Sequence, residues 1–286
     1  MPTGKARLFY PTEMKTILGH RQAFSLIAAL CFVMTASAQG LNELVLTHAV
    51  DFIGTPYVAH TLDRDAEHET LVANCDEVDC TTFVEYVLAR TLTYVEGEEP
   101  SEQDFLNALQ SMRYRNGVID GYASRLHYFT EWIYNALRHG LVEDITAKNS
   151  SYTTTVEVGY MTAHPDQYPQ LVNSEENRAK IRETELVLTG KEVQYLPKDK
   201  LPHNGLPWIK AGDIIAITGG VSGLDIAHLG FAFYVEGKLS LLHASSIEGK
   251  VTVSNLSLAQ MLNNHKTWTG IRVLRLKKSN EMNSGN

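Results

Sequence analysis

The chain has 286 residues, 25 basic and 33 acidic side chains, a net charge of −8 and 44% hydrophobic residues. A protein this negative is not expected to bind nucleic acid or anionic lipid surfaces. Its hydrophobic content can form a sizeable core in one large or two small domains, and three cysteines are too few for a disulfide scaffold.

The segment 1–38 has the features of a signal peptide. Basic residues precede an apolar run from Ala23 to Met34, and Ala36-Ser37-Ala38 is a small-x-small cleavage signal. The run is too short to span a bilayer comfortably, and no later stretch approaches the roughly 20 apolar residues that a membrane helix needs. We therefore expect cleavage after Ala38 and a secreted or periplasmic protein without a membrane span.

Cleavage would leave residues 39–280 as the folded domain and residues 281–286 as a flexible tail. The removed segment carries four basic side chains against one acidic side chain, so the mature chain has a net charge of −11.

The first helix is predicted over residues 42–53, with Asn42 as its candidate cap. Gly54 and Pro56 end it, and residues 57–78 are predicted to be mostly loop.

The next helix is predicted to begin at Asp79-Cys80 and to run to about Tyr94, because apolar residues from Phe83 to Leu88 recur on one helical face. Asp79 is a good N-cap, so Cys80 falls at the first helical position. There the helix dipole favours thiolate over thiol, and a thiolate attacks carbonyl carbon well. The alternative is a packing role, which most helical cysteines have.

Cys75 provides a competing interpretation of this segment. In an oxidising compartment Cys75 and Cys80 could form a local disulfide. Such a bridge would pull Asp79-Cys80 away from the helix start, and we therefore favour two free thiols.

The middle of the chain is predicted to be mainly helical. Helices are expected over 101–109, capped by Ser101, over 125–139 and over 174–185, with an extended segment near 185–196. A strand over 214–217 follows.

Two further strands, Ile226 to Val235 and Lys238 to Ser245, flank Glu236-Gly237, a two-residue turn that favours a tight hairpin. In this register Val235 pairs with Lys238, and His228 and His243 become diagonal neighbours on one face. Their rings come within hydrogen-bond reach, and Gly230 leaves space between them.

A single histidine on a strand is most often a half-buried structural residue. Two histidines beside a glycine, downstream of a helix-opening cysteine, indicate a nucleophile, a base and a residue that orients the base. The third residue fixes the tautomer of the base.

Five segments, in chain order, resemble the papain-like cell-wall hydrolases of the NlpC superfamily, in the N-acetylmuramoyl-L-alanine amidase-like branch. They are Gly54-Thr55-Pro56-Tyr57, Asp79-Cys80-Thr81-Thr82-Phe83, Gly212-Asp213-Ile214-Ile215, His228-Leu229-Gly230 and His243-Ala244-Ser245. The segment from Gly121 to Tyr128 is similar to the same branch.

The resemblance implies Cys80 as nucleophile, His228 as base and His243 as the orienting residue. It also implies Tyr57 near the oxyanion site, with the Cys80 backbone N–H as a donor. The fold it implies is α+β: a papain-like (NlpC-type) antiparallel sheet packed against helices, whose central strands carry both histidines.

The stretch between Cys80 and Asp213 is far longer than compact members of the superfamily need. We expect residues 100–210 to form a large helical insertion over the cleft. Arg125 is the candidate for binding a substrate carboxylate, with Tyr122 and Tyr128 as walls; the alternative is an ordinary surface arginine on a helix.

We therefore predict an exported cysteine amidase acting on peptidoglycan or muropeptides, with N-acetylmuramoyl–L-alanine as the preferred bond on the branch resemblance alone. An endopeptidase cutting between D-glutamate and the diamino acid is the nearest alternative. A non-catalytic muropeptide-binding protein and an acyltransferase stay open. A zinc amidase is disfavoured because the chain lacks His-Glu-x-x-His and Cys-x-x-Cys, so neither a metal nor another cofactor is expected.

Overall fold

The structure, a computed structural model, describes residues 40–63, 68–95 and 101–277. The predicted signal peptide, its cleavage site at Ala38 and the predicted tail 281–286 lie outside these residues. Within them, no helix is both long and apolar enough to cross a membrane.

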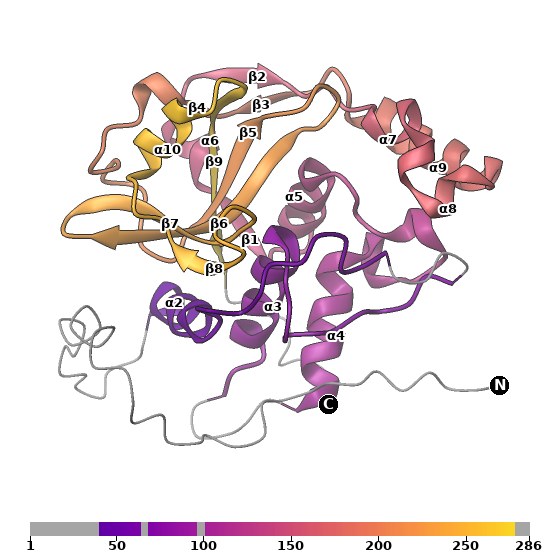
Figure 1. Cartoon of the computed structure of the whole chain (residues 1–286), viewed down its shortest axis with the longest axis horizontal. Coiled ribbons are helices and arrows are strands. Elements are labelled where there is room, and N and C mark those ends of the chain that lie inside the picture. Colours follow the sequence, from indigo (N-terminus) through magenta and orange to yellow (C-terminus); the bar gives the residue numbers. More distant parts are fainter. Residues whose placement is uncertain (1–39, 64–67, 96–100, 278–286) are drawn as a thin grey trace.

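A seven-stranded antiparallel sheet forms the centre of the fold, with the order β1-β9-β5-β6-β7-β8 and β4 beside β9 (Figure 1). A separate two-stranded sheet joins β2 and β3. The strands are β1 (Val142–Asp144), β2 (Thr153–Thr155), β3 (Glu192–Gln194), β4 (Leu196–Pro197), β5 (Ile214–Gly219), β6 (Ile226–Val235), β7 (Lys238–Ser245), β8 (Lys250–Val253) and β9 (Trp268–Leu276).

Helices cover both faces of the large sheet, so the mixed helix and antiparallel-sheet class expected from the sequence is confirmed. On one face the core joins the sheet to α2 (Leu41–Asp51), α3 (Cys80–Leu92), α4 (Glu102–Arg113) and α5 (Phe129–Arg138). On the other face α6 (Ile145–Asn149) and α10 (Leu258–Asn264) enclose a second core.

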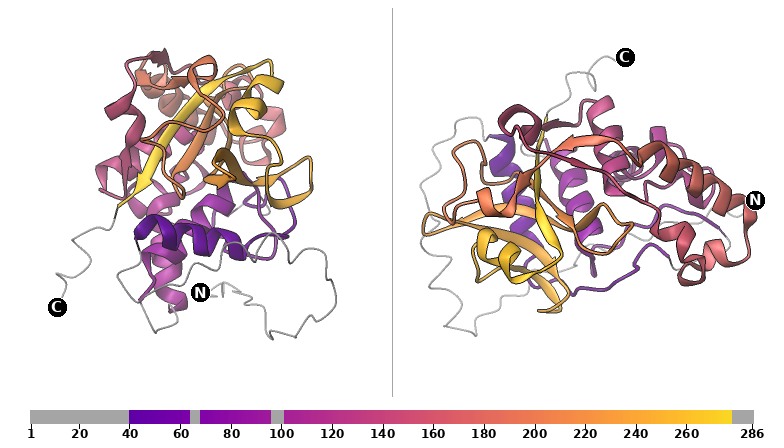
Figure 2. Two further views of the ribbon diagram at one scale, coloured as in Figure 1. Left: turned by 90° about the vertical axis from the view of Figure 1, so that its left-hand side faces the viewer. Right: turned by 90° about the horizontal axis from the view of Figure 1, so that it is seen from above.

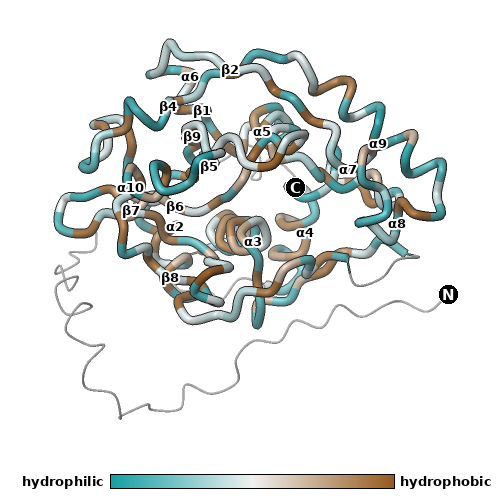
Figure 3. Tube along the Cα trace, turned by 45° about the horizontal axis from the view of Figure 1, so that its top comes forward, coloured by the Kyte–Doolittle hydropathy of each residue, from teal (hydrophilic) through white to brown (hydrophobic). Residues whose placement is uncertain are grey.

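Strand β5 shows why both faces are covered. Ile214 and Ala216 belong to the first core, whereas Ile215 and Ile217 belong to the second. Because successive side chains of a strand point to opposite faces, a run of four buried apolar residues requires cover on both sides. Helix α3 contributes a continuous run of buried residues to the first core, and Figure 3 shows it as hydrophobic and central.

Three predicted helix starts can be compared with the structure. Asp79 and Ser101 cap α3 and α4 as predicted. The predicted Asn42 cap is wrong: α2 has Gly40 at its N-cap, and the Asn42 amide donates to the Ala211 carbonyl and to Asp213. The Asn42 side chain, which the local pattern assigned to the helix N-terminus, therefore makes long-range hydrogen bonds instead.

The predicted insertion contains α4 to α9, including α7 (Tyr160–Ala163), α8 (Pro169–Val172) and α9 (Glu175–Leu188). Helices α7, α8 and α9 lie at one end of the molecule, away from the β6–β7 hairpin (Figure 2). They have their own small hydrophobic core. The insertion meets the loop before β6, the strand that carries His228, at Gly223, whose carbonyl accepts hydrogen bonds from the Gly159 and Tyr160 amides.

Helix α5 begins at Phe129, four residues later than predicted. The preceding residues form a 3-10 turn over Tyr122–Ser124, and Arg125 pairs with Tyr114 in an isolated antiparallel bridge. The extended backbone of Arg125 in this bridge is incompatible with the predicted helical start at residue 125.

Candidate active site

Cys80 occupies the first turn of α3, as the sequence predicts. The Asp79 carboxylate accepts hydrogen bonds from the amides of Thr81 (3.0 Å) and Thr82 (2.8 Å), and the Thr82 hydroxyl accepts one from the Asp79 amide. This capping box uses the donors next to Cys80 and keeps the half-buried thiol at the positive end of the helix.

The β6–β7 hairpin has the predicted turn and register. Glu236 and Gly237 have φ values of 49° and 76°, as a two-residue type I′ turn requires. Val235 pairs with Lys238, and the register continues to Phe231 opposite Leu242.

The two histidines meet as expected. Nε2 of His228 lies 2.6 Å from Nδ1 of His243, and the rings are nearly perpendicular at 87°. Gly230 makes this approach possible: a Cβ at this position would lie 2.6 Å from the Leu242 carbonyl oxygen and 3.0 Å from the His243 Cβ. Any larger residue would have to displace the strand that carries His243.

A bulge in β6 sets the direction of the His228 side chain. Ile217 of β5 pairs with His228, but Thr218 pairs with Ile226, so Ala227 is an extra residue in β6. Such bulges break the alternation of a strand and redirect a neighbouring side chain. The bulge could not be predicted from the sequence, because Ala227 carries no turn or breaker signal.

Helix α3 places the thiol beside this strand. Phe83 packs edge-to-face on Phe231 of β6, with ring centroids 5.5 Å apart. The thiol is hydrogen-bonded by the Leu229 backbone, by the Thr81 side chain and by its own backbone. Leu229 directly follows His228 in β6, so its contact with Cys80 brings the thiol close to His228. Because His243 binds Nε2 of His228, Nδ1 is the ring nitrogen of His228 that stays available.

The three groups are uncharged at neutral pH. Burial, followed by the charge of Asp79, raises the pKa of the Cys80 thiol to about 12. Burial lowers the pKa of His228 to about 3, with further contributions from His243 and His265, and burial lowers that of His243 to about 4. The expectation of a lowered thiol pKa is therefore wrong for the resting protein, because desolvation outweighs the helix dipole.

Tyr57 lies near the thiol. Its segment pairs with the residues before α3: the Val58 amide donates to the Val78 carbonyl, and the Val78 amide donates to the Pro56 carbonyl. Burial raises the pKa of the Tyr57 hydroxyl, and the charges of Cys80 and Asp79 add to this rise. Two segments that a long loop separates in the sequence are thus joined at the candidate site.

Two aromatic residues that no sequence pattern indicated complete the surroundings of His228. Trp268 stacks parallel to the His228 ring at 6.2 Å, and His265 stacks on Trp268 at 3.7 Å. Trp268 is the first residue of β9 and His265 is the C-cap residue of α10, and the pairing of β9 with β5 brings them close to His228. No periodic pattern in the sequence could have indicated this.

Arg125 does not have the predicted role of binding a substrate carboxylate. Its side chain is only 5% exposed, and its guanidinium already pairs with Asp63 (2.5 Å) and Glu69 (3.5 Å). The pair with Asp63 holds the loop that follows Tyr57. The surface-arginine alternative also fails, because the residue is buried.

Replacing Arg125 with methionine is expected to destabilise the fold by about 3–5 kcal/mol, because Asp63 and Glu69 would lose their buried partner. Denaturant unfolding measures this loss. The exposed Arg138, also in the insertion, is the matched control, and Arg138→Met should stay within about 0.5 kcal/mol of the wild type. Unchanged stability in Arg125→Met, with weaker binding of acidic substrate only, would restore the original assignment.

The predicted walls Tyr122 and Tyr128 are also not available to a ligand. Tyr122 is 4% exposed and packs under the Arg125 guanidinium, 5.1 Å from its ring centroid. Tyr128 is 1% exposed, and its hydroxyl donates to Glu185 and accepts from the Met161 amide. Both tyrosines stabilise the core of the insertion.

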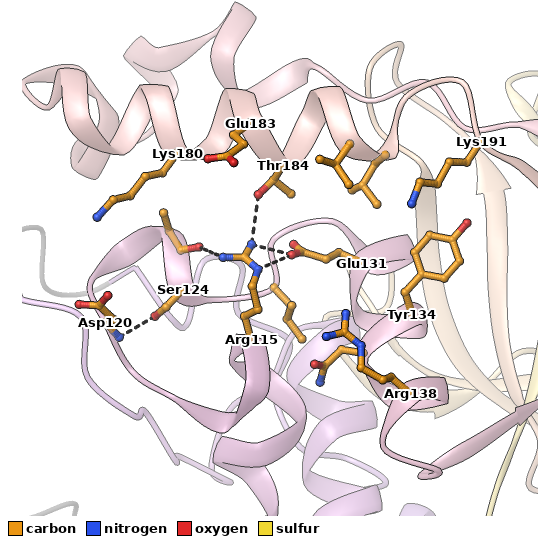
Figure 4. A pocket seen from close by; sticks show the side chains of 15 residues that line it. Arg115, Asp120, Ser124, Glu131, Tyr134, Arg138, Lys180, Glu183, Thr184 and Lys191 are labelled. Atoms are coloured by element: carbon orange, nitrogen blue, oxygen red, sulfur yellow. Dashed lines mark hydrogen bonds and ion pairs between the residues drawn. The ribbon is translucent and has the colours of Figure 1, made fainter.

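A cavity of about 480 Å³ between α5 and α9 is separate from the cysteine and histidines (Figure 4). Its central Arg115 is bound by Glu131, by the Thr184 hydroxyl and by the Ala123 carbonyl. Lys191 packs on the Tyr134 ring. These contacts hold α9 on α5 and give the cavity a structural explanation.

Both cysteines in the described part of the chain, Cys75 and Cys80, are free. Within the same residues, no cluster of histidine, cysteine and acidic side chains could hold a metal ion.

The arrangement defines a candidate cysteine–histidine site at the junction of a helix and an antiparallel sheet. Residues 48–271 match the family model described as N-acetylmuramoyl-L-alanine amidase-like, and the chain belongs to this family. The family is one of amidase-like hydrolases, and it implies peptidoglycan as the substrate class.

Solved structures agree with this membership. The crystal structure of an N-acetylmuramoyl-L-alanine amidase from Bacteroides uniformis is 55% identical, with a TM-score of 0.80, over 82% of this chain and 99% of that one. A putative xylanase from Bacteroides fragilis is also 55% identical, with a TM-score of 0.78, over 81% of this chain and 100% of that one.

A protein from Legionella pneumophila shares the fold at 23% identity and a TM-score of 0.62, over 83% of this chain and 89% of that one. None of the curated proteins matches the chain.

Proposed function

We propose that the protein is an exported cysteine amidase of the papain-like NlpC superfamily that hydrolyses the N-acetylmuramoyl–L-alanine bond of peptidoglycan. The observation that carries this proposal is the position of Cys80 at the start of α3, against the strand whose His228 is hydrogen-bonded to His243. The bond itself is taken from the family and from the Bacteroides uniformis relative.

The neutral resting state supports a general-base mechanism. As Sγ of Cys80 attacks the amide carbonyl carbon, Nδ1 of His228 accepts the thiol proton. The Cys80 backbone N–H and the Tyr57 hydroxyl are the proposed donors to the oxyanion of the tetrahedral intermediate. His243 holds Nε2 of His228 and thereby keeps Nδ1 directed to the thiol.

The intermediate collapses when the carbon–nitrogen bond breaks and His228 gives its proton to the leaving amine. The remaining thioester is hydrolysed by water, from which His228 again takes the proton. The products are a free carboxylate, a free amine and the regenerated thiol, so no cofactor is consumed.

The endopeptidase that cuts between D-glutamate and the diamino acid uses the same steps on another amide, and it remains the second candidate. A non-catalytic muropeptide-binding protein and an acyltransferase would keep the same fold. A glycosidase, as the name of the Bacteroides fragilis relative suggests for that protein, would need two carboxylates facing one cleft. The groups around Cys80 are instead two imidazoles and a phenol, and the neighbouring carboxylate, Asp79, is the N-cap of α3.

Mass spectrometry of defined muropeptides tests the proposal. N-acetylmuramic acid and a peptide with a free L-alanine amine are the expected products. A cut after D-glutamate would favour the endopeptidase, and products extended by an added amine would favour the acyltransferase. Tight binding without any product would overturn the enzyme assignment. Activity that survives a chelator and is abolished by iodoacetamide separates a cysteine enzyme from a zinc amidase.

The pH profile of kcat/KM should not show the fall in activity near pH 6.5 that a histidine base with its usual pKa produces. A base must be neutral, and because the pKa of His228 is lowered to about 3, it stays neutral well below its usual value of 6.5. The thiol pKa of about 12 moves the alkaline limb upward. We expect kcat/KM on an uncharged substrate to stay within about twofold from pH 5.5 to pH 8.5; half-maximal activity near pH 6.5 would contradict this.

A further inference from the structure

A second cavity, of about 370 Å³, lies at the end of the sheet where β6 begins. The loop between β5 and β6, the start of α5 and the β2–β3 pair surround it. Seven of the residues that line it carry hydroxyl groups: Thr130, Thr154, Thr155, Thr218, Ser222, Thr267 and Thr269. Hydroxyls at this density are suited to a polar ligand.

Arg272 of β9 also lines this cavity, and it is only 2% exposed. Its Nη2 atom pairs with Asp144 at 3.0 Å. Its Nε and Nη1 atoms have no hydrogen-bond partner among the described residues. Leaving two donors of a buried cation unpaired is costly, and an anion that enters the cavity would supply the missing acceptors.

The cavity lies close to the thiol. Ile226 lines it, and Leu229, three residues further along the same strand, contacts Cys80. A strand rises about 3.3 Å per residue, and the bulge at Ala227 shortens this rise, so at most about 10 Å separate the two positions along the strand. An extended peptide covers that distance with about three residues. An anionic group two or three residues from the scissile amide would therefore reach Arg272.

The other charged residues around the cavity are acidic, so Arg272 supplies its positive charge. Asp144 occupies one of the three guanidinium nitrogens. Asp225 accepts a hydrogen bond from the Thr130 amide at the start of α5, and Glu157 is exposed at the rim. A protein with a net charge of −8 otherwise repels acidic peptides, so a buried arginine near the thiol is a strong determinant of which peptide is accepted.

We propose that this cavity is a subsite for a carboxylate of the stem peptide, with Arg272 as its specificity-determining residue. The ligand is the free α-carboxylate of the acidic residue that follows L-alanine. The inference rests on the proposed function for the identity of the peptide. It replaces Arg125, whose guanidinium is paired with Asp63 and Glu69, with an arginine that lines a cavity and has two donors without a hydrogen-bond partner.

Two substrates that differ in one group test the subsite. N-acetylmuramoyl-L-alanyl-D-glutamate carries the free α-carboxylate, and the D-isoglutamine analogue carries a carboxamide in its place. The wild type should prefer the acid by about 10-fold or more in kcat/KM, the ratio expected from one charge-assisted hydrogen bond. In Arg272→Met this preference should disappear through a loss on the acid alone, and Arg272→Lys should retain part of it.

The matched control is Arg275 on the same strand. It binds Asp213 with two hydrogen bonds of 2.7 Å and does not line the cavity. Arg275→Lys should lower thermal stability but keep the preference for the acid. If Arg272→Met does not fold, the Arg272→Lys variant carries the test, because lysine can still pair with Asp144.

Binding of the two ligands to Cys80→Ala protein, measured by calorimetry, separates the subsite from the enzyme assignment. If each Arg272 variant, Arg272→Met and Arg272→Lys, still cleaves both substrates but loses as much activity on the carboxamide as on the acid, the subsite is overturned and the proposed function stays intact. If the wild type cleaves neither substrate, the proposed function fails. The subsite then stands only if Cys80→Ala binds the acid about 10-fold more tightly and the added Arg272→Met change removes that difference.

Discussion

Replacing Cys80 with alanine or serine is expected to lower turnover of muropeptide by at least about 10⁴-fold while the protein stays folded. The thiol is half-buried at the start of α3, and the capping box that stabilises the helix is made by Asp79 and Thr82. The substitution therefore removes the nucleophile without removing the cap. Steady-state rates with mass-spectrometric detection, together with a thermal melt, measure both effects.

Cys75 is the control for this experiment. Its thiol is half-buried and packs against the main core, and burial raises its pKa to about 11. It is free, so removing it breaks no disulfide. Cys75→Ala should keep most of the activity. Equal losses in the two variants, reversed by neither reductant nor oxidant, would show that Cys80 is not the sole nucleophile.

The sequence predicted the parts of the site that depend on local pattern. The N-cap at Asp79 follows from an acidic residue before an amphipathic segment. The ends of β6 and β7 and their register follow from a two-residue Glu236-Gly237 turn between alternating strands. Once this register was fixed, the meeting of His228 and His243 required only the geometry of a hairpin.

The remaining parts depend on contacts between distant segments. Arg125 looked free in the sequence, but its partners Asp63 and Glu69 come from a loop that precedes α3 and α4 in the chain. Trp268 reaches His228 because β9 inserts beside β5, a topology that no local signal specifies. The thiol pKa depends on how much water the completed fold excludes from Cys80, which also cannot be derived from a helix position alone.

Replacing His228 with alanine is expected to reduce kcat/KM nearly as much as the loss of Cys80. Triad members act as a unit, because a thiol with a pKa of about 12 is inert without a base to take its proton. His243→Ala should be roughly one to two orders of magnitude less damaging. That change keeps the base and removes only the hydrogen bond that fixes its tautomer and orientation.

His243→Asn provides the matched variant for the orienting role, because its side-chain amide oxygen can accept the proton on Nε2 of His228. If orientation is the function of His243, asparagine should recover a large part of the activity that alanine loses, with little change in KM. The recovery would appear in kcat, since His243 is buried and acts through His228. If His243→Ala is instead more damaging than His228→Ala, the two roles must be exchanged, and Nε2 of His243, the ring nitrogen that His228 leaves available, becomes the atom that takes the thiol proton.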